Sequence, residues 1–528
     1  MRRYDLIVVG AGPAGLSAAI EAAEHGMSVG IFDENSRPGG QLFKQIHKFF
    51  GSKEHKAKMR GFNIGYRLLD DADRLGVDVH LNSVVMGIYN PLRITVSEEG
   101  GISSFSADNI ILATGASENA APFEGWTLPG VIGAGAAQTM MNLHGVMPGK
   151  RILMVGSGNV GLVVSFQLLQ AGCMVEAVID SASRIGGYGV HAAKVARTGV
   201  PFLLSHTIVK AEGSGKVEKV TIAQVDSRFK VVKGTEKELE VDTVCLAVGL
   251  SPMSQLARMA GCDINNATLA PKCDIYGHTS VSGLFAAGDV SGIEEASSAM
   301  IEGRIAALSA AKRSGFISVG EFEKRYEYQQ KSLMKLRKGM FCRENKGRTD
   351  LTSTDEGYPL SISLMKKGYI SEDEIKLYPG AAESSEAGVH PVIECTQNIP
   401  CNPCQDACKF GYISVGDDIT RIPSVKENCN CINCGMCVAA CPGQAIFLID
   451  NDAEPGFAYI TIPYEFIPLP ATGERGVALD RSGKTVCQAE VVLVRTGKAF
   501  DHTALLTIKV PSDMSGRARF YKGNGGEG

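Results

Sequence analysis

The cysteines of this 528-residue sequence are the residues whose spacing points most directly to chemistry. Nine of the fifteen fall in one stretch, between Cys395 and Cys441. The last four of these follow the spacing Cys-x2-Cys-x2-Cys-x3-Cys-Pro, at Cys431, Cys434, Cys437 and Cys441. Thiolates so spaced hold iron–sulfur cubes or structural zinc. In a cytosolic chain, such clustering favours metal over disulfides.

An upstream half repeats part of this pattern. Cys401-x2-Cys404-x3-Cys408 is followed by Gly-Tyr-Ile, where the downstream half has Gly-Gln-Ala-Ile. The arrangement resembles two-cluster bacterial ferredoxins, in which the cysteine before proline ligates the other cube. It departs from them at Asn398, where a further cysteine is expected, and Cys395 is the nearest replacement.

The duplicated spacing predicts two [4Fe–4S] clusters. The first takes Cys395, Cys401, Cys404 and Cys441, and the second takes Cys408, Cys431, Cys434 and Cys437. Zinc and a single cube are the competing interpretations, although zinc explains neither the Cys-Pro pair nor the second half. The ninth thiol, Cys429, is interpreted as an unligated bystander.

A glycine-rich turn near the N-terminus predicts a nucleotide site. Residues 4–15 read YDLIVVGAGPAG, and a small-residue helix and a second apolar run ending at Asp33 follow. In this dinucleotide-binding pattern Gly10 allows the tight turn, Gly12 lets a pyrophosphate approach, and Gly15 lets helix and strand pack closely. The helix N-terminus faces the anion, and Asp33 lies where a carboxylate binds ribose hydroxyls.

A second motif indicates that this nucleotide is FAD. Gly288-Asp289, between an apolar strand and the helix from Ala296, resembles the second FAD motif of the two-dinucleotide flavoprotein reductases. That resemblance implies that the aspartate binds the ribityl-pyrophosphate part of FAD, and the connector 110–116 also matches. The predicted FAD ligands are Gly10, Gly12, Ala14, Gly15, Asp33, Glu34, Gly40, Gln41, Thr114, Gly115, Gly288 and Asp289.

A second βαβ unit begins at Lys150 and predicts another nucleotide fold. Its candidate ligands are Gly156, Gly158, Asn159, Gly161 and Asp180. Asp180 favours the free 2′-hydroxyl of NAD over the 2′-phosphate of NADP, while the nearby Arg184 leaves that choice open. The alternatives are a domain that keeps the fold without a nicotinamide and one that holds another adenine nucleotide.

The length and the order of motifs predict several domains. We expect an α/β fold with two Rossmann-like domains of the glutathione and thioredoxin reductase type, a ferredoxin-like iron–sulfur domain and a small C-terminal β module. The expected boundaries are 1–120 with 272–315 for FAD, 121–271 for the second nucleotide, 316–390 for a helical connector, 391–453 for the clusters, and 454–528 for the β module and tail.

Charge and hydropathy restrict the location and the partners. A net charge of −4 gives no general basic surface, which disfavours nucleic acid and anionic membranes. The sequence starts almost directly in a strand, so no signal peptide is expected. The uncharged run 152–173 contains glycines at nucleotide-fold spacing and is interpreted as a buried strand and helix. We therefore expect a cytoplasmic protein without a transmembrane segment.

One stretch resembles a narrower family. Residues 123–162, which begin FEGWTLPGVIGAGAAQ, with Arg37 to Gln41, resemble the α subunits of heteromeric FAD-dependent amino- and imino-acid dehydrogenases. These include opine oxidase, hydrogen cyanide synthase and hydroxyproline or proline dehydrogenase complexes, and the resemblance covers about residues 1–315. It implies a partner β subunit, which is a flavin-containing amine-oxidase-like protein that oxidises the substrate. The cysteine module and β tail depart from the usual members and leave the terminal acceptor open.

The combined motifs predict an electron-transfer subunit. Nicotinamide exchanges hydride, flavin exchanges one or two electrons, and a cube exchanges one, so a chain with all three is a relay. We expect an FAD-dependent iron–sulfur oxidoreductase acting within a complex on CH–NH donors, with NAD or ferredoxin as an acceptor. The alternatives are a self-contained NAD(P)H:ferredoxin-type oxidoreductase and a non-catalytic scaffold stabilised by nucleotides. The ten histidines show no catalytic or metal spacing, so the catalytic residues and the amine substrate stay unassigned.

Overall fold

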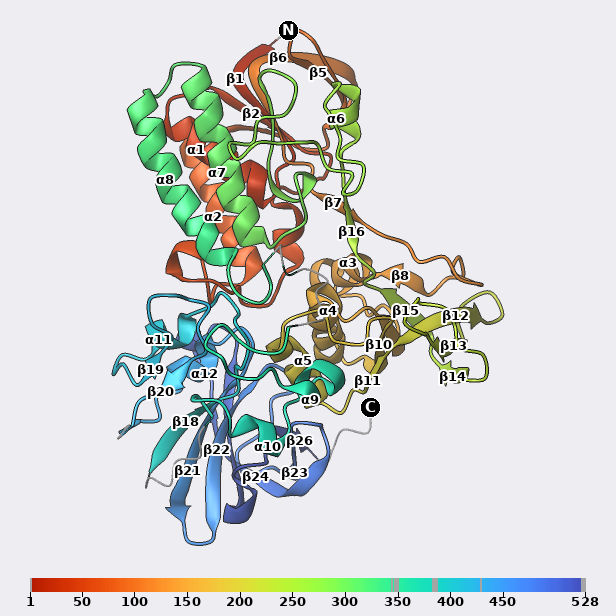
Figure 1. The fold of residues 1–528 in the computed structure, drawn as a ribbon, viewed down its shortest axis with the longest axis vertical. Helices are drawn as coiled ribbons and strands as arrows, with labels where there is room; N and C mark the ends of the chain where they lie inside the picture. Colours follow the sequence, from red (N-terminus) through yellow and green to blue (C-terminus); the bar gives the residue numbers. More distant parts are fainter. Residues whose placement is uncertain (1, 343–344, 346–350, 382–387, 428–429, 524–528) are drawn as a thin grey trace. The chain divides into compact units, whose positions relative to one another are not determined.

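The computed structural model describes residues 2–342, 345, 351–381, 388–427 and 430–523 (Figure 1). Cys429 lies outside this part of the chain, so its predicted bystander role stays a prediction. The chain divides into two compact units, each formed from several segments. Unit 1 comprises residues 1–49, 54–119 and 249–336, and unit 2 comprises residues 50–53, 120–248 and 337–528.

Unit 1 is built on a seven-stranded sheet in the order β3-β2-β1-β6-β5-β4, with β17 also paired to β6. The apolar strand β1 is parallel to both β2 and β6, as the predicted βαβ pattern requires. The strands are β1 (Arg2–Val9), β2 (Val29–Phe32), β3 (Asp78–His80), β4 (Val84–Tyr89), β5 (Arg93–Glu98), β6 (Gly101–Leu112) and β17 (Leu284–Ala286).

Four long helices accompany this sheet: α1 (Pro13–Glu24), α2 (Gly61–Arg74), α7 (Ala296–Arg313) and α8 (Val319–Leu336) (Figure 1). Small residues let α1 and α7 approach closely, because a Cβ atom on Gly303 would lie 2.1 Å from the carbonyl oxygen of Ala14. The remaining elements are β7 (Ala116–Glu118), β16 (Leu250–Pro252), α6 (Gln255–Met259) and the 3-10 helices η1 (Gly40–Lys44), η2 (Lys53–His55) and η4 (Gly288–Val290).

Unit 2 contains the second nucleotide fold, a five-stranded sheet in the order β11-β10-β9-β15-β8. Its strands are β8 (Val131–Gly133), β9 (Arg151–Val155), β10 (Met174–Asp180), β11 (Phe202–Leu204) and β15 (Thr243–Leu246). The helices are α3 (Ala134–Gln138), the π-helix η3 (Thr139–Leu143), α4 (Asn159–Gln170) and α5 (Gly189–Ala196). A three-stranded sheet follows, made of β12 (His206–Glu212), β13 (Lys219–Gln224) and β14 (Lys237–Glu240).

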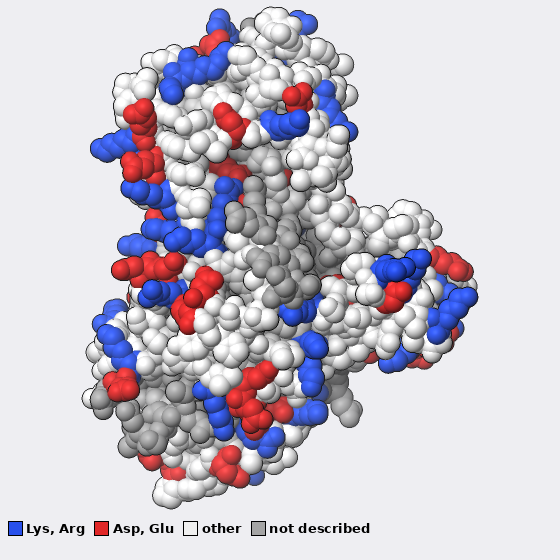
Figure 2. Space-filling view, in the orientation of Figure 1, with Lys and Arg blue, Asp and Glu red and all other residues white. Residues whose placement is uncertain are grey.

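The uncharged run 152–173 forms strand β9 and helix α4, as predicted. Leu153, Val164 and Leu168 of this run are fully buried, which explains its hydropathy by core packing. Within the described residues, no helix combines the length and the apolar character that crossing a bilayer requires. Figure 2 shows basic and acidic side chains interspersed on the face in view, in keeping with the small net charge of −4.

The cysteine-rich segment of unit 2 is a duplicated structure. Strand β18 (Val389–Ile393) precedes the first half and pairs antiparallel with β21 (Ile446–Glu454), which follows the second half. Strand β19 (Ile413–Ser414) follows the first half and pairs antiparallel with β20 (Ser424–Val425), which precedes the second. A short helix lies inside each half, α11 (Pro403–Ala407) and α12 (Met436–Ala440). This crossed pairing is the ferredoxin-like arrangement that the sequence predicts.

The C-terminal β module is confirmed and is part of a larger sheet. Seven strands form the order β18-β21-β22-β25-β24-β23-β26. The added strands are β22 (Phe457–Tyr464), β23 (Arg475–Leu479), β24 (Thr485–Arg495), β25 (Ala504–Pro511) and β26 (Phe520–Gly523), with 3-10 helices η6 (Lys498–Phe500) and η7 (Ser512–Met514). Because β18 and β21 flank the cysteine halves, the sheet continues across the predicted boundary at residue 454. The five predicted domain boundaries stay predictions.

In the connector, one carboxylate caps two helices, α9 (Ile362–Lys367) and α10 (Glu372–Ile375). Ser371 and Glu374 form a capping box at α10. The Glu374 carboxylate also accepts hydrogen bonds from the Ile362 N–H at 2.8 Å and the Ser361 hydroxyl at 2.8 Å, both at the start of α9. Although burial alone raises the pKa of Glu374, hydrogen bonds from Ser361, Ser371 and Ser363 lower it to about 2.

Replacing Glu374 by alanine is therefore expected to loosen both helix starts. Loss of the cap removes about 1–2 kcal/mol from local stability, so the Ile362 and Ser363 amides should exchange hydrogen roughly 5–30 times faster. Since the folded pKa is depressed from 4.5 to about 2, wild-type protection should be complete above pH 4.5 and weaken as the pH falls towards 2. Hydrogen exchange measured by mass spectrometry tests both effects.

The matched control is Glu372→Ala on the same helix, because Glu372 forms an exposed ion pair with Arg517 at 2.9 Å. Exchange in this variant should stay within about twofold of wild type, as expected for a surface ion pair. Equal acceleration in the two variants would contradict the capping role of Glu374.

Candidate functional site

Two of the three glycines in the first predicted nucleotide loop are required by close backbone packing. Gly10 has φ +103°, and a Cβ there would lie 2.4 Å from the carbonyl oxygen of Ala113. A Cβ on Gly15 would lie 1.9 Å from the carbonyl oxygen of Gly10. These positions let β1 turn directly into α1 beside β6. They match the turn and packing roles that the sequence predicts.

Gly12 differs from both, since a Cβ there would meet no atom within 4 Å. Its backbone has φ −75° and ψ −172°, which any residue adopts, and it is the N-cap of α1 without a side-chain cap. Open space therefore lies beside Gly12 at the start of α1, at the position where the sequence predicts a pyrophosphate. Gly40 covers this loop, because its Cβ position lies 2.9 Å from the Gly12 Cα, and the Gly39 N–H donates to the Ala11 carbonyl at 2.7 Å.

The acid at the end of the second strand supports this loop. The Asp33 carboxylate accepts the Ala11 N–H at 2.6 Å and the backbone and side-chain N–H groups of Asn35, each at 2.8 Å. An ionised carboxylate has about four acceptor positions, so one is left for a ribose hydroxyl. Asp33 is buried, whereas the neighbouring Glu34 is exposed. Asp33 thus stiffens the glycine loop in addition to its predicted contact with ribose.

The second FAD motif lies against the first. A Cβ on Gly288 would lie 2.8 Å from the Ala14 Cβ, which places this motif at the start of α1. The Gly288 N–H donates to Glu302 at 2.9 Å, and Asp289 accepts the Glu294 N–H at 3.2 Å. Sequence reasoning missed Glu302, because a single acid in a small-residue helix carries no pattern.

The predicted connector residues lie in the same unit and close the end of β6. The Thr114 hydroxyl donates to the Met253 carbonyl at 2.8 Å, and the Gly115 carbonyl accepts the Met253 N–H at 3.0 Å. Gly115 has φ +71°, a conformation that favours glycine. The two bonds fix the chain where it leaves the sheet of the first nucleotide fold.

The second nucleotide loop reproduces the geometry of the first. A Cβ on Gly156 would lie 2.3 Å from the Ala247 carbonyl oxygen, and one on Gly161 would lie 2.1 Å from that of Gly156. A Cβ on Gly158 would again meet no atom within 4 Å. Asp180 accepts the Ser157 N–H at 2.7 Å, as Asp33 accepts the Ala11 N–H. The two loops therefore share both the packed and the open glycine positions.

The duplication extends to the segments that cover the two loops, which sequence reasoning missed. Residues 183–187, Ser-Arg-Ile-Gly-Gly, repeat the Ser-Arg-Pro-Gly-Gly of residues 36–40. The Gly187 N–H donates to the Ser157 carbonyl at 2.9 Å, and the Tyr188 N–H donates to the Asn159 side chain at 2.8 Å. The Ser-Arg-x-Gly-Gly repeat was the available signal. Arg184 donates to the Leu351 carbonyl at 3.0 Å.

The eight predicted cysteine ligands fall into two electrostatic groups. Burial raises the pKa of Cys401, and the neighbouring Cys404, Cys441 and Cys395 raise it further. Burial likewise raises the pKa of Cys437, with further contributions from Cys431, Cys434 and Cys408. The membership of each group is that predicted for one cube. In the described residues, no three His, Cys, Asp or Glu side chains converge to hold a single metal ion.

The fourth predicted ligand of each half occupies an equivalent backbone environment. The Tyr412 N–H donates to the Cys408 sulfur at 3.4 Å, and the Ala445 N–H donates to the Cys441 sulfur at 3.4 Å. In both halves the donor lies four residues after the cysteine. Hydrogen bonds to sulfur stabilise a thiolate and are typical of iron–sulfur ligation. The donor set and its surroundings therefore fit two cubes.

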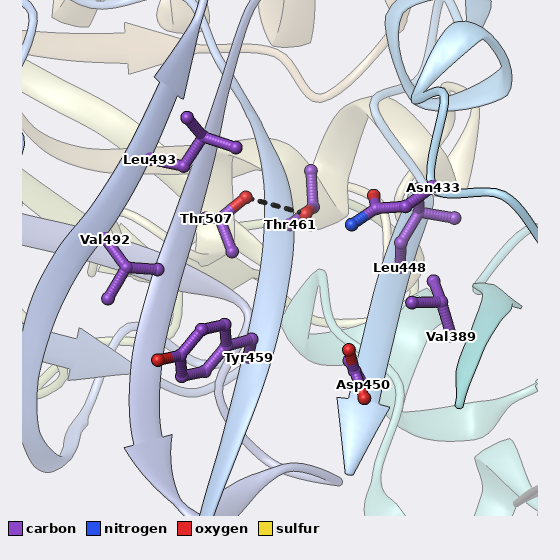
Figure 3. Close-up of a pocket in the computed structure, with 9 residues that line it drawn as sticks. All are labelled: Val389, Asn433, Leu448, Asp450, Tyr459, Thr461, Val492, Leu493 and Thr507. Atoms are coloured by element: carbon purple, nitrogen blue, oxygen red, sulfur yellow. Dashed lines mark hydrogen bonds between the residues drawn. The ribbon is translucent and has the colours of Figure 1, made fainter. Parts of the chain in front are cut away.

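A cavity of about 350 Å³ lies on the C-terminal sheet (Figure 3). Its lining residues are Val389, Asn433, Leu448, Asp450, Tyr459, Thr461, Val492, Leu493 and Thr507. The hydroxyls of Thr461 and Thr507 bond to each other at 2.9 Å, as the dashed line in Figure 3 shows. Asn433 belongs to the second cysteine loop, so this cavity adjoins the Cys434 side of the module.

The two nucleotide folds and their shared loop geometry define the class of protein, an FAD-dependent oxidoreductase with two Rossmann-like domains. The chain belongs to the pyridine nucleotide-disulphide oxidoreductase family, whose model matches residues 4–312. The family match ends before the cysteine module. The predicted fold class is thereby confirmed.

Individual relatives and a solved structure are also similar to this chain. The chain is 33% identical to an opine oxidase subunit of Agrobacterium tumefaciens (strain Ach5) over 337 residues, 58% of this chain and 65% of that protein. Hydrogen cyanide synthase subunit HcnB of Pseudomonas aeruginosa is 29% identical over 349 residues, 61% and 74% of the two chains. T. acidophilum thioredoxin reductase shares the fold with a TM-score of 0.50 and 23% identity, covering 60% of this chain and 99% of that one. The predicted resemblance is confirmed.

The open space at Gly12 provides a direct test of FAD binding. Gly12→Leu adds a side chain where the protein itself offers no clash, so we expect a folded protein with at least about tenfold less bound flavin. The matched variant Gly158→Leu alters the second loop and should retain full flavin while losing nucleotide binding there. Flavin absorbance per chain measures the bound flavin, and circular dichroism checks that each variant is folded. Full flavin retention in Gly12→Leu contradicts the assignment.

Proposed function

We propose that this chain is the electron-transfer α subunit of a heteromeric FAD and iron–sulfur dehydrogenase that acts on amino or imino acids. The observation that carries the proposal is the presence of two sets of four cysteines in a duplicated ferredoxin-like arrangement. The same chain also has two nucleotide folds. Flavin, nicotinamide and iron–sulfur groups together supply stepwise passage from two-electron to one-electron chemistry.

The residues of the chain have distinct roles in this proposal. The N-terminus of α1 and the open position at Gly12 bind the FAD pyrophosphate, and Asp33 orients its ribose. Gly158 and Asp180 do the same for NAD, or another adenine nucleotide, in the second fold. Cys408 and Cys441 each bind one cube through a sulfur that also accepts a backbone N–H.

The names of the relatives support the proposal that this chain works with a partner protein. The opine oxidase and hydrogen cyanide synthase relatives are each named as a subunit of a larger enzyme. The chain spans 65% of the first and 74% of the second, and the cysteine module lies beyond the family match. We propose that the partner is a flavin-containing amine-oxidase-like β subunit that oxidises the substrate. Ferredoxin and NAD are the proposed acceptors.

A second candidate function uses the same features without a partner. A self-contained NAD(P)H:ferredoxin-type oxidoreductase also needs FAD, a nicotinamide site and one-electron centres. The match of residues 4–312 to an oxidoreductase family favours this candidate over a scaffold that only binds nucleotides to hold its fold. Reduction of ferredoxin by NADH, with this chain as the only other protein present, separates it from the α-subunit proposal.

Metal content tests the cysteine assignment. We expect about eight irons and eight acid-labile sulfides per chain in protein prepared without oxygen. Cys408→Ser and Cys441→Ser should each reduce the content to about four irons by removing different cubes. Cys487→Ser, in β24, is the control and should keep about eight. A wild-type content of about four contradicts the two-cube assignment, and zinc in place of iron contradicts the whole module.

Isolation from the native host tests the partner. We expect co-purification with a second flavoprotein and activity of the complex with proline, hydroxyproline, sarcosine or an opine. This chain alone should be aggregation-prone or inactive with each of them. A permanent interface is large and apolar at its centre, and its exposure in the absence of the partner favours aggregation. A monodisperse, partner-free protein that oxidises such a substrate would falsify the relay. Unaided reduction of ferredoxin by NADH would support the second candidate instead.

A further inference from the structure

A buried arginine of the second nucleotide fold lies against the first cysteine group. Arg197 follows α5, is 5% exposed, and donates to the Gln444 carbonyl at 2.9 Å and to the Ala193 carbonyl at 3.2 Å. Gln444 belongs to the turn after Cys441, whose carbonyl accepts the Gln444 N–H at 3.2 Å. The guanidinium therefore contacts the turn that presents the Cys441 sulfur. Burial raises the pKa of the Cys441 thiol, and the charge of Arg197 acts in the opposite direction.

Arg197 is one of three buried arginines in this region. Arg481 and Arg519 both donate to the Glu394 carboxylate, at 2.7 Å and 2.5 Å, and their side chains are 7% and 2% exposed. Arg197 and Arg519 also lie 5.2 Å and 5.1 Å from the centre of the Phe447 ring. Burial lowers the pKa of Arg197, and Glu394 is the carboxylate in the described part of the chain whose charge raises it. Three arginines against one carboxylate leave a buried net charge of about +2.

A buried charge without an opposite partner is unfavourable, so a buried anion beside these arginines would stabilise them. A [4Fe–4S] cube with four thiolates carries a net charge of about −2, which becomes about −3 after one-electron reduction. The oxidised cube therefore balances the charge of the arginines. A fixed guanidinium beside it interacts more favourably with the reduced form, because the added electron increases the attraction.

We propose that Arg197 is a positioning residue that raises the reduction potential of the cube held by Cys395, Cys401, Cys404 and Cys441. This inference rests on the proposed iron–sulfur function and goes beyond it by assigning a residue outside the cysteine module. The reduction adds one electron from an external one-electron donor and breaks no bond in the protein. Arg197 thereby makes the first cube a better electron acceptor than it would be without that charge.

The second cysteine group has a weaker counterpart, Arg495. Its guanidinium donates to the carbonyl of Asn433 at 2.6 Å and to the Asn433 side chain at 3.2 Å. Burial lowers the pKa of the Arg495 guanidinium, and the nearby Cys434 thiolate raises it. Arg495 is only partly buried and Cys434 is exposed, so solvent screens this pair more than the Arg197 site. Each cube thus has one arginine at its loop, which provides an internal comparison.

The test is a dithionite redox titration of the full holoprotein, followed by electron paramagnetic resonance. At a fixed ambient potential, Arg197→Met should reduce the ratio of reduced to oxidised first cube about tenfold, a shift of about 59 mV for one electron. Arg197→Lys, which keeps the charge, should restore most of that ratio. The second cube should be unchanged in both variants. Arg495→Met should shift only the second cube, and by a smaller factor.

Glu394→Gln provides a variant with the opposite sign, because it removes the negative charge and keeps an acceptor for Arg481 and Arg519. It should increase the reduced fraction of the first cube, whereas structural damage would not reverse the direction. If Arg197→Met does not assemble the first cube, Arg197→Gln takes its place, because glutamine removes the charge and can still donate to the Gln444 carbonyl. Two intact cubes with ratios unchanged in these variants overturn the role of Arg197. Wild-type protein without iron–sulfur signals instead overturns the proposed function on which it rests.

Discussion

Both nucleotide folds depend on a backbone contact that leaves no room for a side chain. At Gly15 and Gly161 the start of a helix touches the carbonyl of the preceding turn, so a Cβ there would lie 1.9 Å and 2.1 Å from that oxygen. This contact directs the helix axis and its first N–H groups at one point in space. The acids Asp33 and Asp180 then hold the same turn from the second strand. The main chain and these two acids thus fix the geometry of the turn in each fold.

The sequence predicted the elements around these turns closely, because glycine spacing and apolar runs have direct steric causes. Strand β10 ends at Asp180, the acid predicted for the second nucleotide site, and strands β22, β24 and β25 belong to the predicted C-terminal β module. The crossed strand pairing of the duplicated module brings Cys441 to the first half and Cys408 to the second, as the spacing predicts, while the assignment of these cysteines to cubes stays a prediction.

Other features could not be predicted from local patterns. Glu302 bonds to Gly288 across a strand–helix connection, and Arg197 reaches Gln444 over 247 positions of the chain. Such contacts depend on tertiary packing, and an isolated acid or arginine has no periodicity to reveal it. The covering segment at Gly186 and Gly187 is a different case, because its likeness to residues 36–40 was visible in the sequence.

The continuous sheet across residue 454 restricts how this chain can be divided in protein engineering. Strands β18 and β21 enclose the cysteine halves and also begin the sheet that continues through β22 to β26. Phe447 and Leu448 of β21 are buried, as are Ile460 and Ile508 of the strands beyond. A fragment cut at residue 454 would expose the edge of β21 that pairs with β22, together with the apolar side chains buried against the strands beyond. The cysteine halves are therefore inseparable from the β module, and transplantation to another protein requires the complete sheet.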